Sequence, residues 1–314
     1  AQWGWAAVYR PIPPLPLAVL AVAGGVLLVL HAPGWLRAAG LLLLWPALVW
    51  QPPRPAEGRF EVMALDVGQG SAVLVRTAGH SLLYDAGPRY ASGGDAGRRV
   101  VLPLLRALGE EPDAVVISHQ DSDHAGGAEA VRAAWPRARW LSSFDADPAR
   151  RCQAGQRWTW DGVHFEIVHP APAQYRADGS GVLPSNAMSC VLRIVAGGRR
   201  MLLTSDIEAP DEAALLQRYA GDLAADIMLV PHHGSKTSST PDFIKAVGAS
   251  EVIVPVGYRN RFGHPKPEVL ARYEAQGSRL WRTDRDGAVR IDLGEAMPPP
   301  AAWRQEHRRY WQGR

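Results

Sequence analysis

The chain has 314 residues, of which 47% are apolar and 21% charged, and its formal net charge is +3. This composition supplies a sizeable core and excludes a globally disordered chain. The only two cysteines, Cys152 and Cys190, exclude a framework of several disulfides and a zinc ribbon. One bridge and two buried free thiols both remain open. The mild positive charge permits an anionic partner without requiring one.

The first fifty residues are much more apolar than the rest. Residues 15–30 carry no charge, residues 35–50 carry only Arg37, and the intervening 31–34 have the composition of a turn. Each run is slightly shorter than the ~20 residues that a bilayer span usually needs, but neither shows the polar face of a soluble helix. We therefore expect a short transmembrane helical hairpin over 1–50, belonging to a longer membrane protein.

A proline-rich linker is expected at 51–58, a folded domain at 59–295 and a basic, aromatic tail at 296–314. Apolar patterning in the domain predicts strands at 60–66, 71–76, 81–84, 114–117, 157–160, 163–168, 190–195, 200–203, 226–230, 251–254 and 288–291. Helices are predicted at 97–108, 126–134, 211–219, 241–247 and 267–275. Strands with interspersed helices in two similar halves predict an α+β fold of two packed sheets with helices outside.

A dense cluster of metal-ligand residue types follows the predicted strand 114–117. His119, Asp121, Asp123 and His124 lie within six residues, ahead of a Gly-Gly pair. His119 and Asp121 alternate along an extended segment and can point the same way. Without a cation, four such groups would repel or desolvate one another. The cluster therefore predicts a hydrolytic metal centre.

Two later apolar strands also end in ligand types. The first leads to Asp206, for which capping the next helix is the alternative role. The second leads to His232 and His233, and we expect one of the two to pack behind the ligands. A centre with two divalent ions needs about six protein ligands, including a bridging carboxylate. Asp206 and one of the paired histidines, added to the four residues of the first cluster, supply about six ligands.

Several motifs resemble known families. HQDSDH, LLTSD and PHHGS resemble the metal motifs of the metallo-β-lactamase superfamily. More narrowly, DVGQGS, LYDAG, NAMSCVLRI, NRFGHP and TDRDG resemble, in that order over 59–293, the C-terminal domain of the ComEC family of DNA-uptake channel proteins. The resemblance implies an αββα sandwich. It also implies a membrane protein of natural transformation, whose lactamase-like domain is a nuclease that degrades the DNA strand that is not transported.

The resemblance also implies a ligand set for two divalent ions. It assigns six ligands: His119 and Asp121 for the first ion, Asp123, His124 and His232 for the second, and Asp206 as the bridge. His233 is implied to lie beside the ligands or the substrate.

The sequence departs from the superfamily pattern at the first ion. Asp121 stands where the superfamily has a histidine, and a further histidine expected just before residue 190 is absent. Asn186 is the neighbouring candidate for a weak ligand. Both departures weaken the first position for Zn²⁺ and favour a harder ion, with Mn²⁺ ahead of Zn²⁺ and Mg²⁺.

Catalytic and substrate roles follow as hypotheses. Asp123 would help to hold the attacking water, and His264 would donate a proton or a hydrogen bond to the leaving oxygen. A structural histidine beside a turn is the alternative for His264. Flanking phosphates would be held by Ser235, Lys236 and Arg261, for which a solvated loop is the alternative.

Two other functions remain open. The metals could instead hydrolyse a small phosphodiester or a lactone, which a deep closed pocket would favour. The domain could also bind DNA without catalysis and gate a channel. As a ComEC-like protein, the chain is expected in the inner membrane, with DNA and other competence proteins as partners. The soluble domain would then face the periplasm, where a Cys152–Cys190 bridge could form.

Overall fold

The computed structural model describes residues 10–31, 33–176, 181–294 and 297–307. The chain divides into two compact units. Unit 1 contains Ala1–Pro53 and Pro103–Glu111, and unit 2 contains Arg54–Leu102 and Pro112–Arg314. The first division falls inside the proline-rich segment 51–58.

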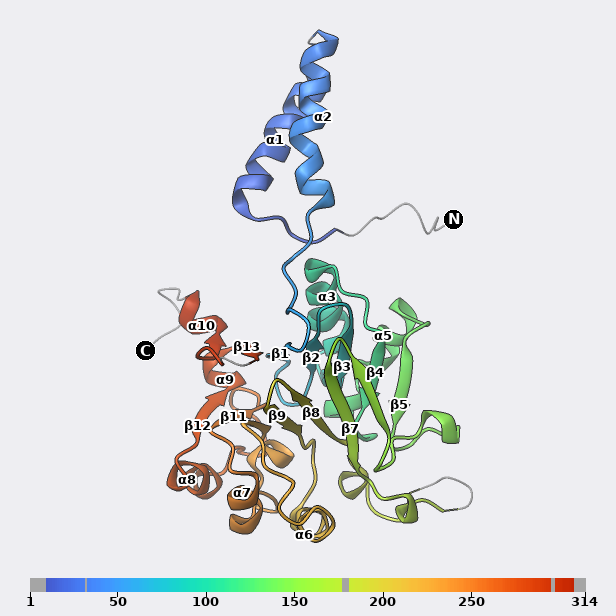
Figure 1. Cartoon of the computed structure of the whole chain (residues 1–314), viewed down its shortest axis with the longest axis vertical. Helices are drawn as coiled ribbons and strands as arrows, with labels where there is room; N and C mark the ends of the chain where they lie inside the picture. Colours follow the sequence, from blue (N-terminus) through green and yellow to red (C-terminus); the bar gives the residue numbers. More distant parts are fainter. Residues whose placement is uncertain (1–9, 32, 177–180, 295–296, 308–314) are drawn as a thin grey trace. The chain divides into compact units, whose positions relative to one another are not determined.

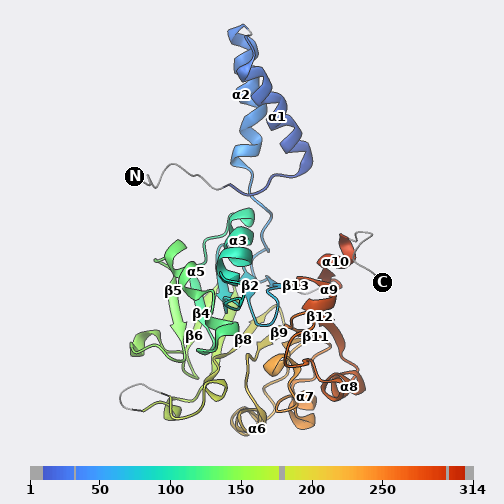
Figure 2. The same ribbon diagram turned by 180° about the vertical axis from the view of Figure 1, so that it is seen from behind.

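Unit 1 holds two apolar helices that lie side by side, α1 (Leu15–Val29) and α2 (Gly34–Val49) (Figures 1 and 2). Gly24 and Gly40 make their close approach feasible, because a Cβ at Gly24 would lie 2.5 Å from the carbonyl oxygen of Gly40. The helices match the two expected apolar runs. Among the described residues, however, no helix combines the length and apolarity needed to cross a membrane, and the transmembrane part of the prediction is not confirmed.

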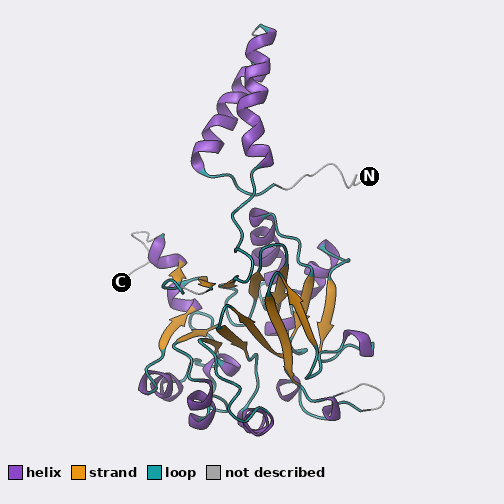
Figure 3. Ribbon diagram, in the orientation of Figure 1, coloured by secondary structure: helices purple, strands orange, loops and turns teal. Residues whose placement is uncertain are grey.

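Unit 2 is built on two seven-stranded mixed sheets (Figure 3). The first has the order β14-β13-β1-β2-β3-β4-β5. Its strands are β1 (Phe60–Ala64), β2 (Val73–Arg76), β3 (Ser81–Tyr84), β4 (Ala114–Ile117), β5 (Arg139–Ser142), β13 (Val289–Leu293) and β14 (Ala301–Ala302). The second has the order β12-β11-β10-β9-β8-β7-β6. Its strands are β6 (Arg157–Trp160), β7 (Val163–His169), β8 (Val191–Ala196), β9 (Arg199–Leu203), β10 (Ile227–Leu229), β11 (Glu251–Val254) and β12 (Arg279–Arg282).

The core lies between the sheets, because alternate side chains of both point inward. Val62 and Tyr84 of the first sheet pack with Ile167 and Leu229 of the second. Three helices cover the outer face of the second sheet: α6 (Ala209–Arg218), α7 (Pro241–Val247) and α8 (Pro267–Ala275). The two-sheet α+β architecture is thereby confirmed.

The other helical segments are short. They are η1 (Gly97–Val101), α3 (Leu102–Leu108), α4 (Ser122–Ala125), α5 (Ala128–Ala134), η2 (Pro148–Arg150), η3 (Pro172–Gln174), η4 (Asn186–Met188), η5 (Pro231–Gly234), α9 (Thr283–Asp286) and α10 (Trp303–Glu306).

Three short strands were not expected from the sequence: β5, β12 and β14. The last of these changes the interpretation of the expected tail at 296–314. β14 pairs with β13, and Arg304 of α10 forms an ion pair with Asp66 at 2.5 Å. The described residues 297–307 are thus joined to the first sheet rather than separate from it.

A disulfide joins Cys152 to Cys190, which are 38 positions apart. It ties the segment after β5 to the residue before β8, and it settles the choice between a bridge and two free thiols in favour of the bridge.

In each sheet, parallel pairing brings the carboxyl ends of two neighbouring strands together. β3 runs parallel to β4 in the first sheet, and β9 runs parallel to β10 in the second. The carboxyl ends of parallel strands meet at the same edge of a sheet. The residues that follow these four ends, at 85, 118–124, 204–206 and 230–233, form the centre described next.

Candidate metal centre

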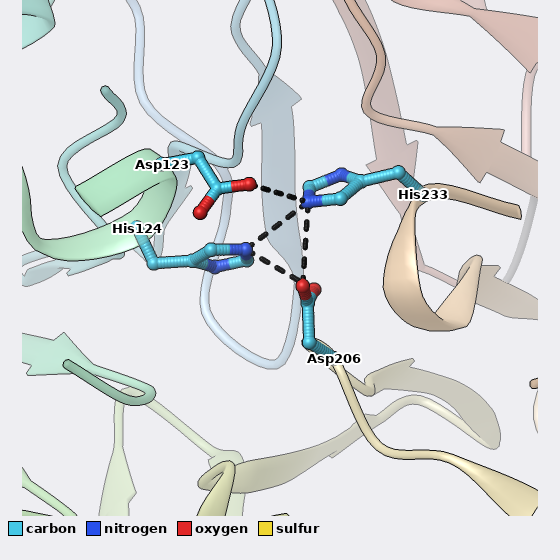
Figure 4. Close-up of side chains that lie close together, drawn as sticks. All are labelled: Asp123, His124, Asp206 and His233. Carbon is cyan, nitrogen blue, oxygen red and sulfur yellow. Dashed lines mark hydrogen bonds and ion pairs between the residues drawn. The ribbon is translucent and has the colours of Figure 1, made fainter. Parts of the chain in front are cut away.

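Four side chains converge where the two sheets meet: Asp123, His124, Asp206 and His233 (Figure 4). One potential ligand atom from each lies within 4.8 Å of all the others. Asp206 lies between the two imidazoles, with its Oδ1 3.1 Å from His124 Nε2 and its Oδ2 3.5 Å from His233 Nε2. Asp123 Oδ2 is 3.3 Å from the same nitrogen of His233. Two carboxylates and two imidazoles therefore face one small volume.

Both histidines are held so that Nε2 points into this volume. His124 Nδ1 donates to Asp85 Oδ2 at 2.7 Å, and His233 Nδ1 donates to the carbonyl oxygen of Pro255 at 2.6 Å. A histidine whose other nitrogen donates to a carboxylate or carbonyl has the usual orientation of a metal ligand.

His119 lies directly beside the four-residue cluster. It is buried, and its ring centroid is 4.3 Å from that of His124. Its Nδ1 contacts the hydroxyls of Ser118 at 3.0 Å and Ser205 at 3.2 Å. Its Nε2 is buried and has no hydrogen-bond partner among the described residues. A buried nitrogen without a partner is costly unless something else binds it.

Asp121 and His232 lie further from the shared volume. Asp121 Oδ2 is 3.9 Å from His119 Nε2, and its side chain is 45% exposed. His232 Nε2 is 3.8 Å from Asp206 Oδ2, while its Nδ1 lies 3.1 Å from Glu208 Oε1. His119 Nε2 also faces Asp206 Oδ2, at 4.0 Å. His232 and His119 therefore both point toward this oxygen, and Glu208 contacts the other nitrogen of His232.

The assignment of the paired histidines differs from the expected one. The sequence placed His232 with Asp123 and His124, and gave His233 a role beside the ligands or the substrate. The structure brings His233 into the cluster and His232 to its margin. Both residues have positive φ, 48° and 53°. The chain therefore turns sharply within the pair, and strand alternation cannot indicate which ring points inward.

The charges of the cluster are strongly coupled. Burial alone would lower the pKa of His124, but the carboxylates of Asp206 and Asp85 outweigh burial and hold this pKa well above its usual value. Burial opposes ionisation of Asp123, yet the hydrogen bond with His233 and the charge of His124 lower the pKa of Asp123 to about 2. The Asp123 carboxylate is thus anionic at neutral pH, and the proton on His124 is stabilised by the carboxylates beside it.

The donor set fits a divalent ion. Carboxylate oxygens and imidazole nitrogens together suit Zn²⁺, Mn²⁺ and similar ions. The ligand atoms are near one another, the imidazoles are preoriented, and the buried Nε2 of His119 has no hydrogen-bond partner in the described part of the chain. A bound cation would replace the imidazole protons that face the carboxylate oxygens of the cluster.

Asp123 also lines an open pocket of about 440 Å³ next to the cluster. Its other lining residues include Gln69, Arg89, Tyr90, Asn260, Arg261 and Phe262. The expected substrate residue Arg261 therefore lies at this pocket. Of the others, Lys236 is exposed, whereas Ser235 is buried with its hydroxyl 3.0 Å from that of Thr237.

His264 lies on the same side as His232. The two rings are edge to face with centroids 5.8 Å apart, and His264 Nδ1 is buried with no partner among the described residues. Burial, followed by the charges of His232 and His233, lowers the pKa of His264 to about 4. At neutral pH it is thus a neutral imidazole that can donate or accept a hydrogen bond.

Comparison with known proteins identifies the family. The model of the metallo-beta-lactamase superfamily matches residues 65–257, which include every residue of the cluster. The chain belongs to the metallo-beta-lactamase superfamily.

Longer proteins also match most of this chain. Competence protein ComA of Neisseria gonorrhoeae is 38% identical over 301 residues, covering 95% of this chain and 42% of that protein. Recombination protein 2 of Haemophilus influenzae is 33% identical over 238 residues, covering 74% of this chain and 29% of that protein. The chain thus spans less than half the length of these relatives. The resemblance to competence proteins that carry a metallo-β-lactamase domain is confirmed.

Among solved structures, the metallo-beta-lactamase fold protein YhfI of Bacillus subtilis is 15% identical with a TM-score of 0.47. The match covers 75% of this chain and all of that one.

Two residues with clear contacts received no site role in the sequence analysis. Asp85 orients His124. Glu208 had no role, yet it orients His232 and lies 3.5 Å from the side-chain amide of Asn186. Asn186 thus faces Glu208. Asp85 belongs to the LYDAG motif and Glu208 lies two residues after the LLTSD motif, but only the fold shows their partners.

Proposed function

We propose that unit 2 is a metal-dependent nuclease, and that the whole protein degrades the non-transported DNA strand during natural transformation. The observation that carries the proposal is the convergence of Asp123, His124, Asp206 and His233 beside the buried Nε2 of His119, which makes no hydrogen bond within the described ranges. The names of the relatives, a competence protein and a recombination protein, support DNA as the substrate.

The centre has residues for two ions of unequal strength. The four-residue cluster would hold one ion tightly. The second would lie between His119, Asp121 and the shared Asp206, with His232 Nε2 facing the same position. The Asp121 side chain is 45% exposed, and its Oδ2 is 3.9 Å from His119 Nε2. We therefore propose that the second position binds its ion weakly and favours Mn²⁺ over Zn²⁺. Bound ions of this kind activate water and neutralise charge on a phosphate.

The chain's own side chains would position the substrate. Arg89 and Arg261 at the pocket beside Asp123 offer two guanidinium groups to backbone phosphates, and exposed Lys236 offers a third cation. His264, neutral at pH 7, would hydrogen-bond the leaving oxygen.

We also propose an inner-membrane location with unit 2 on the periplasmic side. The disulfide supports an oxidising compartment, since such bridges are rare in the cytosol. The apolar helices α1 and α2 support an attachment to the membrane. Fusion of alkaline phosphatase to the C-terminus would report the side, because this enzyme is active only in the periplasm.

A metal-dependence series tests the nuclease. The full chain, purified in detergent and stripped of divalent ions, is given Mn²⁺, Zn²⁺ or Mg²⁺ with labelled single-stranded or duplex DNA. We expect ion-dependent cleavage that falls on the order of 100-fold or more in Asp123→Asn and Asp206→Asn, because each removes a ligand charge.

Asp113→Asn is the matched control. This carboxylate accepts a hydrogen bond from the Ser81 backbone, at the opposite end of β3 from the centre. Its cleavage rate should equal that of the wild type. Cleavage that is undiminished in both ligand variants, or absent with every ion, contradicts the assignment. DNA binding without any cleavage would instead favour a non-catalytic gate.

A small phosphodiester is a second candidate substrate. The pocket of about 440 Å³ lies within the range of roughly 300–1,000 Å³ typical of small-molecule sites. A higher kcat/KM for bis(p-nitrophenyl) phosphate than for DNA would favour this candidate.

A further inference from the structure

The loop between β11 and α8 displays two exposed aromatic rings beside arginines. Tyr258 is 70% exposed and Phe262 is 45% exposed. Arg259 lies over the Tyr258 ring at 5.1 Å, and Arg261 lies over the Phe262 ring at 4.7 Å. The Phe262 ring is also stacked on that of His264, with centroids 5.7 Å apart. The loop therefore places two exposed aromatic rings next to positive charges.

Asn260 braces the loop from within. Its side-chain amide donates to the carbonyl oxygens of Gly257 at 3.0 Å and His264 at 2.6 Å, while its Oδ1 accepts from the His264 backbone at 3.0 Å. The two ends of the loop are thus tied to a single side chain. A braced loop loses little conformational entropy when a ligand binds, so its rings are preorganised.

The loop is continuous with the candidate centre. Asn260, Arg261 and Phe262 line the same pocket as Asp123, a member of the metal cluster. Arg89 lines this pocket as well. A chain of phosphates with a scissile bond near Asp123 would therefore extend directly over this loop.

We propose that Tyr258, Phe262 and their partner arginines form a stacking platform for unpaired nucleotide bases, which directs a single DNA strand toward Asp123. This inference rests on the proposed nuclease function and adds the substrate form. Aromatic rings stack on bases of any sequence, and neighbouring cations bind the backbone between them. Bases in a duplex are already stacked and cannot offer their faces. The platform therefore selects single strands.

Binding measurements test the platform without cleavage. The full chain is titrated in EDTA, so that the DNA stays intact, against a fluorescent oligo(dT) strand, an abasic strand of equal length and a blunt duplex. Wild type should prefer oligo(dT) over both others. Phe262→Ala and Tyr258→Ala should each weaken oligo(dT) binding between about fivefold and a hundredfold, the range measured for loss of one base stack. Their loss on the abasic strand should be much smaller, and Phe262→Trp should retain affinity.

Phe144→Ala is the matched control, because Phe144 is 46% exposed but lines a different pocket. Its affinity for oligo(dT) should equal that of wild type. Equal losses in Phe144→Ala and Phe262→Ala would overturn the platform, as would equal losses on oligo(dT) and the abasic strand. Loss of binding to phosphatidylglycerol vesicles with unchanged DNA affinity would also overturn it, by assigning the loop to a lipid surface.

The platform and the nuclease can fail separately. Ion-dependent DNA cleavage with wild-type affinity in both aromatic variants would overturn the platform and leave the nuclease standing. Base-dependent binding through Phe262, without cleavage in any ion, would support the platform and contradict the nuclease.

Discussion

Asp85 Oδ2 lies 2.7 Å from Nδ1 of His124, and both side chains are fully buried. The other oxygen of the same carboxylate accepts a hydrogen bond from the Ser118 backbone at 2.8 Å. Asp85 has a φ of 60°, so β3 ends in a left-handed residue that brings its carboxylate beneath the ligand loop. One buried side chain thus fixes both the start of this loop and the orientation of one candidate ligand.

Replacing Asp85 by Asn should weaken metal binding. The amide can still accept from the Ser118 backbone, but its NH₂ group would face His124 Nδ1 and shift the imidazole proton to Nε2. A protonated Nε2 cannot bind an ion. We expect the dissociation constant for Mn²⁺ to rise about 10- to 100-fold, as for other partners of metal-binding histidines. Isothermal titration calorimetry measures this, with Asp113→Asn as control. Unchanged affinity in Asp85→Asn would show that the contact does not orient His124.

Substitution of Gly70 in the DVGQG motif should also weaken metal binding, in this case for a steric reason. Its φ is 138°, and a Cβ there would overlap the carbonyl oxygen of Asp123. Gly70→Ala should therefore displace Asp123 and weaken Mn²⁺ binding at least about tenfold. Gly93 also has a positive φ of 87°, but a Cβ there meets nothing within 4 Å. Gly93→Ala should lower stability by about 1 kcal/mol through backbone strain alone and leave the metal affinity intact. Equal metal affinities in the two variants would contradict the steric explanation.

Much of this centre could be predicted because its residues follow strongly apolar strands. The run 114–117 was predicted as a strand and is β4, with His119 and Asp123 just beyond its end. The pair His232 and His233 could not be resolved, since both take left-handed backbone conformations that residue type does not encode. Short strands such as β5, with one exposed arginine and three buried residues, lack enough periods of alternation to be recognised. Contacts between distant segments, such as Arg304 with Asp66, leave no local pattern at all.

The Cys152–Cys190 disulfide should stabilise unit 2 substantially. It closes a segment with a sequence separation of 38, for which loop entropy predicts roughly 4 kcal/mol. The Cys152→Ala/Cys190→Ala double variant should therefore melt at a lower temperature than wild type. A reducing agent should lower the Tm of wild type to nearly that of the variant and leave the variant unchanged, as measured by differential scanning calorimetry. Wild-type melting that ignores the reducing agent would contradict this contribution.

Asp161 should make the stability of unit 2 depend on pH. It lies in the two-residue turn between β6 and β7, and its Oδ2 accepts from the Thr77 hydroxyl and the Gly79 backbone, each at 2.6 Å. The same oxygen lies 3.1 Å from His80 Nδ1. The hydrogen bond from Thr77, followed by that from Gly79, lowers the pKa of Asp161 from 3.8 to about 2, although partial burial opposes this. One carboxylate therefore links the β6–β7 turn of the second sheet to the β2–β3 turn of the first.

The sign of the pH dependence follows from this depressed pKa. The folded protein binds the Asp161 proton less readily than the unfolded chain does. The stabilisation is therefore complete above the unfolded pKa and is lost as pH falls towards about 2. Asp161 has a left-handed backbone, with a φ of 49°, and asparagine tolerates this conformation. Asp161→Asn should lower the free energy of unfolding at neutral pH by about 1 kcal/mol. Urea denaturation from about pH 7 to pH 3 should show this difference shrinking on the acidic side. In Thr77→Val, which removes the hydroxyl, an NMR titration should show a higher pKa for Asp161. A difference between Asp161→Asn and wild type that stays constant across this range would mean that the carboxylate charge does not stabilise the turn.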